Sequence, residues 1–258
     1  MIGSTAELDI LRDNTHILIV VMIFCVVQSV FGMGLLVFGT PTLIILDVPF
    51  RDCLLFLVPA SLTISLLQIG SIGNFRQSGL GGQIPLLSCA VFLGFLVHIL
   101  PIGPVRLEGP LGVVMLCYGL ARMSARIGTE VAQFVRHRFL GMTVAMGVLH
   151  GASNMGGAIL AILSSARFSD KNELQSFVAA NYAVLAGSQL IVLFFVMNHF
   201  HIASAMASAT VALVVFTLLG RRVFRAINSN LFGKLFTGFI FAYSIALLWK
   251  YGQNAWTV

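Results

Sequence analysis

Residues 147–158 read GVLHGASNMGGA, and they place four glycines, a histidine and an asparagine in the middle of the uncharged stretch Phe139–Ala166. A second uncharged stretch, His16–Leu46, contains GMGLLVFGTP at residues 32–41. Glycine in a helix interior costs about 1 kcal/mol relative to alanine, and proline costs about 3 kcal/mol. We therefore expect both stretches to be apolar helices that are interrupted near these residues.

The composition is that of an integral membrane protein. Of the 258 residues, 58% are apolar and 9% are charged, and the mean hydropathy is +0.98, far above that of a soluble domain. The Lys and Arg residues behind the net charge of +6 are scattered between apolar runs, so we interpret them as cytoplasmic anchors and expect no nucleic-acid partner. The four cysteines lack metal-ligand spacing, and we expect no metal and no cofactor.

The uncharged runs predict an all-α integral membrane protein with eight hydrophobic elements. At about 20 residues per span, little remains for a soluble domain, so residues 1–258 should form a single polytopic membrane transporter domain. The elements are His16–Leu46, Cys53–Phe75, Gln77–Val105, Gly109–Ala121, Phe139–Ala166, Leu174–Met197, Ile202–Gly220 and Leu235–Trp249, with Asn198, His199 and His201 marking a polar break between the sixth and seventh. A charged connector, residues 122–138, separates two halves of four elements.

The two halves resemble each other, which indicates an internal duplication. Repeat one spans about 15–123 and repeat two about 138–251. The matching segments are Phe38-Gly39-Thr40-Pro41 with Met155-Gly156-Gly157-Ala158, and Val58-Pro59-Ala60-Ser61 with Val178-Ala179-Ala180-Asn181. Glycines and a proline at matching positions favour paired helix breaks there. The alternative is that the glycines only allow close helix packing, as small residues do in membranes.

The distribution of basic residues predicts the topology, because Lys and Arg in short loops stay on the cytoplasmic side. Eight simple crossings divide these residues seven against eight, with no bias. If the first and fifth elements each return to the side they enter from, the division is eleven against four. The larger set is Arg76, Arg122, Arg126, Arg136, Arg138, Arg167, Lys171, Arg221, Arg222, Arg225 and Lys234. We therefore expect two inverted repeats with broken or re-entrant first and fifth elements, which is typical of secondary transporters.

The residues near the breaks favour an anionic ligand. No Asp or Glu lies deep in an apolar run, which argues against a carboxylate proton relay, whereas backbone N–H groups and half-helix dipoles at a break suit an anion. His150 either binds the anion, carries a coupled proton or only bonds a neighbouring helix. Ser153 lies near His150, but no carboxylate orients the imidazole, so we do not expect an enzyme. The polar residues near the breaks and on the following helices are Gln28, Ser29, Thr40, Thr42, His150, Ser153, Asn154, Ser61, Thr63, Ser65, Gln68, Asn181, Tyr182, Ser188 and Gln189.

The glycine motifs resemble those of the TauE/SafE sulfite exporter family of probable membrane transporters. The resemblance rests on residues 32–41, on Leu46-Asp47-Val48-Pro49 with Arg51, and on residues 147–157, and the two-half layout covers essentially the whole chain. It implies a multi-pass permease of the bacterial inner membrane for sulfite, sulfonates or related small organic anions. The chain departs from the family's consecutive glycines, with Thr40 after Gly39 and Asn154 where a glycine is common.

Matching these motifs residue by residue gives the candidate substrate site. Its positions are Gly39, Thr40, Pro41, Asn154, Gly156 and Gly157, joined by His150 and, from the following helices, Ser61 and Asn181. The prediction is a secondary transporter that moves a small anion by alternating access, with proton or sodium coupling, direction and oligomeric state left open. The alternative is a non-transporting membrane scaffold or assembly subunit, a membrane-embedded enzyme ranks third, and a channel also stays open.

Overall fold

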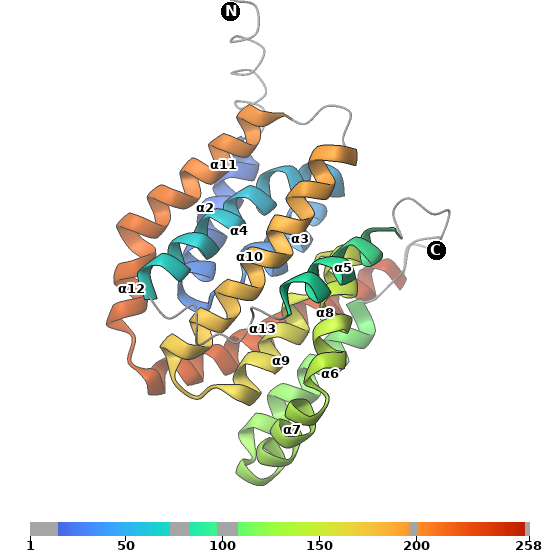
Figure 1. Ribbon diagram of the computed structural model, residues 1–258, viewed down its shortest axis with the longest axis vertical. Helices are drawn as coiled ribbons and strands as arrows, with labels where there is room; N and C mark the ends of the chain where they lie inside the picture. The colour runs from blue at the N-terminus through green and yellow to red at the C-terminus, as the bar shows by residue number, and fades with distance from the viewer. Residues whose placement is uncertain (1–14, 73–82, 97–107, 197–200, 256–258) are drawn as a thin grey trace, which may run out of the picture.

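The computed structural model describes residues 15–72, 83–96, 108–196 and 201–255, and the regular structure in these ranges is helical. The helices are α2 (Thr15–Phe31), α3 (Leu35–Ile45), α4 (Phe50–Ile72), α5 (Ile84–Phe95), α6 (Glu108–Met123), α7 (Ala125–His137), α8 (Phe139–Ser153), α9 (Gly157–Arg167), α10 (Lys171–Val196), α11 (Ile202–Val215), α12 (Arg221–Ala226) and α13 (Ser229–Ala255). A π-helical turn, η3 (Phe216–Gly220), joins α11 to α12 (Figure 1). Within these ranges the predicted all-α fold is confirmed.

Several helices are long and apolar enough to cross a membrane. Among the described residues there are four such spans, namely Phe50–Ser71, Lys171–Phe195, Ile202–Ala226 and Ser229–Gln253. Shorter apolar helices, α2, α3, α5, α6, α8 and α9, complete the bundle. Many large apolar side chains are exposed, as expected for a surface in contact with lipid. The chain is therefore a multi-pass helical membrane protein, as predicted.

Parts of the predicted layout lie outside the described residues. Of the third predicted element, the structure describes only the part that forms α5. The polar break expected at Asn198 and His199 and the predicted cytoplasmic residue Arg76 also lie outside. The charged connector is a helix, α7, which packs against α6 and α9.

The first predicted break exists but lies elsewhere than expected. α2 ends at Phe31 and α3 begins at Leu35, so the chain breaks at Gly32–Gly34. Gly32 and Gly34 have φ angles of 77° and 145°, which glycine adopts without strain. The prediction of a break at Gly39–Pro41 is wrong, because these residues lie inside α3. The fixed φ of proline fits a helix, and here the helix continues through it at the cost of one backbone hydrogen bond.

The second break lies where the sequence predicts it. Asn154, directly after α8, adopts the left-handed conformation with a φ of 62°, which asparagine tolerates better than most residues. Gly156 directly precedes Gly157, the first residue of α9. Gly34 likewise directly precedes Leu35, the first residue of α3. The structure therefore makes Gly34 the counterpart of Gly156, whereas the sequence alignment paired Gly156 with Gly39.

The α8–α9 pair is a hairpin that begins and ends at the same end of the molecule. Arg136, just before α8, donates a hydrogen bond from Nε to the carbonyl of Ala166 in the last turn of α9 at 3.0 Å. The guanidinium of Arg167 lies 5.0 Å from the ring centre of Phe139, the first residue of α8. α2 and α3 likewise pack against each other. Neither pair is one continuous span.

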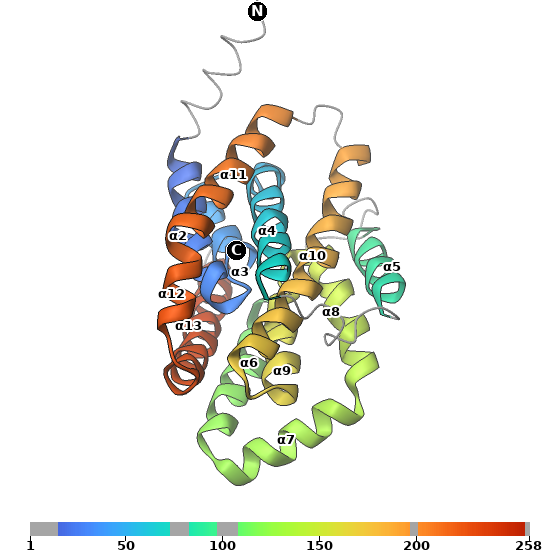
Figure 2. The same cartoon turned by 60° about the vertical axis from the view of Figure 1, so that its left-hand side comes forward.

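The helix contacts of the two halves occur in matching pairs. α4 packs against α10 and α6 against α13, while α5 packs against α8 and α11 against α2 (Figures 1 and 2). Gln68, near the end of α4, and Gln175, near the start of α10, both donate to the carbonyl of Ser29. The end of α4 thus meets the start of α10, so these two central helices run antiparallel.

Glycines allow α5 and α8 to approach each other closely. A Cβ at Gly94 would lie 2.0 Å from the carbonyl oxygen of Val148, and a Cβ at Gly151 would lie 2.1 Å from that of Val91. Membrane helices use small residues for such backbone contacts. Close packing therefore explains Gly151, one of the four glycines in residues 147–158. The glycines at the second break, Gly156 and Gly157, need another explanation.

Gly151→Ala should destabilise the protein by about 1–3 kcal/mol, because the new methyl group would meet a backbone carbonyl that cannot rotate away. A lower Tm of the purified variant in detergent would show this loss of stability. Gly141→Ala in the same helix is the matched control, since nothing lies within 4 Å of its Cβ position, and its Tm should stay level or rise slightly. Equal Tm values for the two variants would contradict the observed α5–α8 packing.

Candidate functional site

The first break is closed by a buried glutamine. Gln28, three residues before the end of α2, donates from Nε2 to the carbonyl and to Oγ of Ser61, each at 3.0 Å. Its Oε1 accepts the N–H of Leu35, the first residue of α3, at 3.3 Å. Gln28 and Ser61 are fully buried. One side chain therefore ties α2, α3 and α4 together.

Two more glutamines bind carbonyl groups in the last turn of α2, of which that of Gln28 also accepts the N–H of Gly32 at 2.7 Å. Gln68 Nε2 donates to the carbonyls of Gln28 and Ser29 at 2.9 and 3.1 Å. Gln175 Nε2 donates to the carbonyls of Ser29 and Val30 at 2.8 and 3.1 Å. The protein itself thus supplies the partners that an interrupted helix needs at membrane depth.

At the second break His150 occupies the position that Gln28 holds in the first. It also lies three residues before the end of its helix. Its Nε2 lies 3.1 Å from Oε1 of Gln189, and Gln189 Nε2 donates to the carbonyl of His150 at 3.3 Å. Gln189 in α10 therefore caps α8 as Gln68 in α4 caps α2.

Asn154 joins the second break to the first hairpin. Its Nδ2 donates to Oγ1 of Thr40 in α3 at 2.7 Å. Both side chains are buried, and they lie 114 positions apart in the sequence. The structure thus brings together two residues that the sequence assigns to one site from opposite halves.

Polar atoms converge at the second break without hydrogen-bond partners. In the described part of the chain, no partner is found for His150 Nδ1, Asn154 Oδ1 or the hydroxyl of Tyr182, all fully buried. The rings of His150 and Tyr182 meet edge to face at 6.1 Å. A Cβ at Gly156 would lie 3.1 Å from His150 Nδ1, and a Cβ at Gly157 would lie 2.3 Å from the Tyr182 oxygen. Buried polar atoms nearly always have partners, so these groups require an explanation.

The start of α9 adds backbone donors at the same place. The first hydrogen bonds of this segment run from Ala158 N–H to the carbonyl of Met155 at 3.1 Å and from Leu160 N–H to that of Gly156 at 3.0 Å. The N–H groups of Gly156 and Gly157 precede these bonds, at the positive end of the helix dipole. The buried polar residues of the described ranges include no Asp, Glu, Lys or Arg. The second break therefore offers neutral groups beside a helix N-terminus.

The remaining predicted site residues lie elsewhere. Gly39 faces α4, where Leu57 Cδ2 would lie 2.8 Å from its Cβ. Pro41 is buried inside α3, and Ser61 belongs to the first break. Asn181 donates from Nδ2 to the carbonyl one turn earlier in its own helix at 2.8 Å. Thr40, His150, Asn154, Gly156 and Gly157 are thus the predicted residues that meet at one place.

Tyr182 completes the site, and the candidate set does not include it. Tyr182 is one of the polar residues that the sequence places on this helix, but the sequence gives no reason to choose it over its neighbour Asn181 as a site residue. Adjacent helical residues point about 100° apart, so the choice depends on how α10 is rotated about its axis. That rotation is set by packing, here by the contact with His150, which the sequence does not show.

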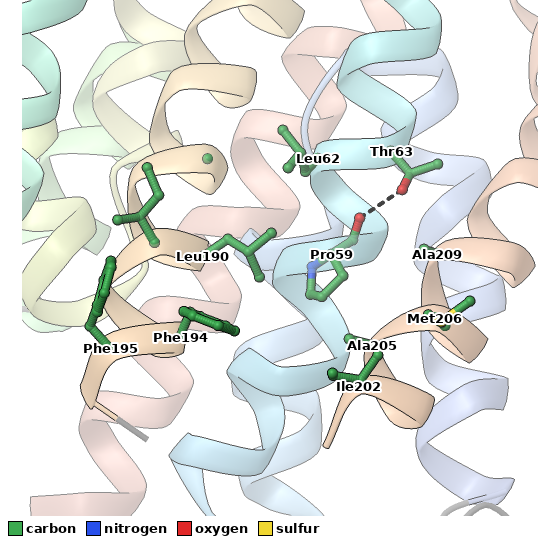
Figure 3. A pocket seen from close by; sticks show the side chains of 12 residues that line it. Pro59, Leu62, Thr63, Leu190, Phe194, Phe195, Ile202, Ala205, Met206 and Ala209 are labelled. Carbon is green, nitrogen blue, oxygen red and sulfur yellow. Dashed lines mark hydrogen bonds between the residues drawn. The ribbon is translucent and has the colours of Figure 1, made fainter. Parts of the chain in front are cut away.

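A separate groove lies between α4, α10 and α11 (Figure 3). Its volume is about 640 Å³, and its walls are apolar side chains such as Pro59, Leu190, Phe194 and Met206. The hydroxyl of Thr63 in its wall already donates to the carbonyl of Pro59 at 2.9 Å. Burying an anion there would leave its charge without partners, so the groove is not a candidate anion site.

Comparison with protein-family models, curated proteins and solved structures finds no match for this chain. The geometry of the two breaks is therefore the basis for inferring a function. They hold equivalent places in the fold but differ in how far they are closed. Among the described residues, the first break is closed by glutamine side chains and leaves one of their polar atoms, Gln68 Oε1, without a partner. At the second break His150, Asn154 and Tyr182 each have a buried polar atom without one.

Proposed function

We propose that the protein is a secondary transporter that binds a small anion at the second break and moves it across a membrane by alternating access. The proposal rests on His150 Nδ1 and the Tyr182 hydroxyl, which lie beside Gly156 and Gly157 at the start of α9, and on Asn154 two residues before Gly156. Each of these three side chains has a polar atom that lacks a partner in the described ranges. A bound ligand would supply the missing hydrogen bonds. All three side chains are fully buried, so this conformation corresponds to a closed site.

An anion fits the electrostatics of this place. The N-terminus of α9 carries a partial positive charge, and the N–H groups of Gly156 and Gly157 lie there. The Tyr182 hydroxyl adds a side-chain donor beside Gly157. Within the described ranges no buried carboxylate opposes an anion. Because the donors are neutral, the anion can leave without stranding a buried cation.

The arrangement of the hairpins supports an inverted repeat. α2 ends beside Gln175 near the start of α10, while the end of α8 lies beside Gln189 in the last third of the same helix. The two hairpins therefore approach the centre from opposite ends. We assign α2–α6 and α8–α13 to two inverted repeats with re-entrant hairpins, as in transporters whose sites lie at broken helices. Movement of the α8–α9 hairpin, together with α5 packed closely on it, against the rest of the bundle would open the site to each side in turn.

Basic residues support one orientation in the membrane. Arg122, at the end of α6, donates to Thr237 near the start of α13 at 3.2 Å. Lys171, at the start of α10, donates to the carbonyl of Phe224 in α12 at 3.1 Å. Figures 1 and 2 place these helix ends with α7 at one end of the molecule. The positive-inside rule assigns that end to the cytoplasm.

The resemblance to the TauE/SafE sulfite exporter family supports the choice of substrate. The two glycine motifs, residues 32–41 and 147–157, each contain one of the observed breaks. We therefore propose sulfite, a sulfonate or a related small organic anion as the substrate, membership in that family, and a bacterial inner membrane as the location.

Tyr182→Phe should reduce uptake of labelled sulfite into proteoliposomes by at least about tenfold. A hydrogen bond to a charged group contributes about 1.5–3 kcal/mol, and 1.4 kcal/mol corresponds to a factor of ten. The Tm should not fall, because the hydroxyl has no hydrogen-bond partner among the described residues, and its removal therefore leaves none of them unpaired. Tyr118→Phe makes the same chemical change where the hydroxyl bonds Ser165 at 2.7 Å, and it should retain uptake.

Two results would count against the proposal. Folded wild-type protein that carries none of sulfite, taurine, sulfoacetate and acetate, with or without a proton or sodium gradient, would favour the scaffold alternative. Equal sulfite uptake by wild type and Tyr182→Phe would refute the placement of the site. Where flux occurs, its dependence on the imposed gradient identifies the coupling ion.

Single cysteines introduced at Arg136 and Arg167 should react with an impermeant maleimide from the same side of sealed vesicles, because α8–α9 begins and ends at one end of the molecule. A cysteine at Arg51, which belongs to the smaller basic set, should react from the other side. Exposed Cys89 and Cys117 are first replaced by serine. Labelling of positions 136 and 167 from opposite sides would rule out the re-entrant hairpin.

A further inference from the structure

We propose that the transported anion carries a hydrogen-bond donor of its own, a hydroxyl or ammonium group close to its charged group. This inference rests on the proposed function and narrows its substrate class. It follows from the hydrogen-bonding roles that the polar atoms at the second break have in the structure.

Nδ1 of His150 is a hydrogen-bond acceptor. The amide of Gln189 is oriented by its Nε2–H bond to the His150 carbonyl at 3.3 Å, which turns Oε1 toward the imidazole. An amide oxygen only accepts, so His150 Nε2, 3.1 Å away, carries the ring proton. The other nitrogen of a neutral imidazole then has a free lone pair. Among the described residues, nothing donates to it.

Oδ1 of Asn154 is a second acceptor. In the structure Nδ2 donates to Thr40 Oγ1 at 2.7 Å, so Oδ1 lies on the far side of the amide from that hydroxyl. The side chain is fully buried, and the described part of the chain offers no donor to Oδ1. His150 and Asn154 are one helical turn apart, and both flank the start of α9.

The same place also contains donors. The Tyr182 hydroxyl and the N–H groups of Gly156 and Gly157 can bind the charged group of an anion. An anion with acceptor atoms only, such as acetate, would satisfy these donors and leave the two acceptors of His150 and Asn154 without partners. Buried acceptors left in that state disfavour binding. An anion with an adjacent donor satisfies both sets of groups at once.

The first break shows what the second lacks. There the position of His150 is occupied by Gln28, whose Oε1 accepts the N–H of Leu35 at 3.3 Å. The glutamine acceptor therefore has a donor from the next helix, whereas Nδ1 of His150 has none among the described residues. At the first break Gln68 Oε1 also lacks a donor among the described residues, so the contrast concerns this one pair of equivalent positions. The acceptor of Gln28 has its donor, and that of His150 needs one from outside.

Matched anion pairs test the inference in proteoliposomes that contain the full-length protein. Glycolate is compared with acetate, and 2-hydroxyethanesulfonate with ethanesulfonate, because each pair shares its charge and differs by one hydroxyl group. Taurine adds an arm in which the donor is an ammonium group. We expect uptake of the donor-bearing member to exceed that of its partner by at least about tenfold, since sites built for a hydroxyl strongly reject analogues without one.

Asn154→Gly gives a second readout, because glycine adopts the φ of 62° at this position and removes Oδ1. The ratio within each pair should fall toward one in this variant and stay at the wild-type value in Tyr118→Phe. Equal or greater uptake of acetate and ethanesulfonate by wild type overturns the inference and leaves the transporter proposal standing. An unchanged ratio in folded Asn154→Gly also overturns it. No uptake of any anion overturns the proposed function and this inference with it.

Discussion

The hydrocarbon interior of a membrane offers no water to an interrupted helix, so each break in this protein must find partners for its free N–H and C=O groups within the protein. At the first break, three glutamines supply these partners. At the second, Gln189 caps α8 and Thr40 binds Asn154, while other polar atoms face the start of α9 without partners among the described residues. The placement of the proposed anion site depends on this difference.

Close helix packing holds the two hairpins in equivalent positions. Ser29 and Gly151 each follow the residue that lines a break, Gln28 in one half and His150 in the other. A Cβ at Gly220 would lie 2.3 Å from Oγ of Ser29, and a Cβ at Gly151 would lie 2.1 Å from a carbonyl of α5. Glycine thus brings a neighbouring helix against each hairpin, η3 on α2 and α5 on α8. Both contacts join the two repeats, because α2 and α5 belong to one repeat and α8 and η3 to the other. Each hairpin is therefore expected to move together with a helix of the opposite repeat.

Hydrophobicity and glycine placement predict the helical membrane fold, the two interrupted elements and the second break, because they act locally. The position of the first break could not be predicted in this way. Gly39 and Pro41 look more disruptive than Gly32 and Gly34, yet the positive φ angles that form the break belong to the latter pair. Tyr182 could not be identified as a site residue from the sequence for a different reason, since its orientation depends on the rotation of α10 against another helix.

Hydrogen–deuterium exchange of the purified protein, with and without saturating hydrogensulfite, tests most directly whether the ligand binds at the second break. Hydrogensulfite carries a hydroxyl group next to its charge, as the site requires. Peptides covering residues 154–160 should gain protection on ligand binding while peptides covering residues 32–38 should not, because the glutamines already close the first break. Equal protection of both segments, or protection of the first segment alone, would contradict ligand binding at the second break.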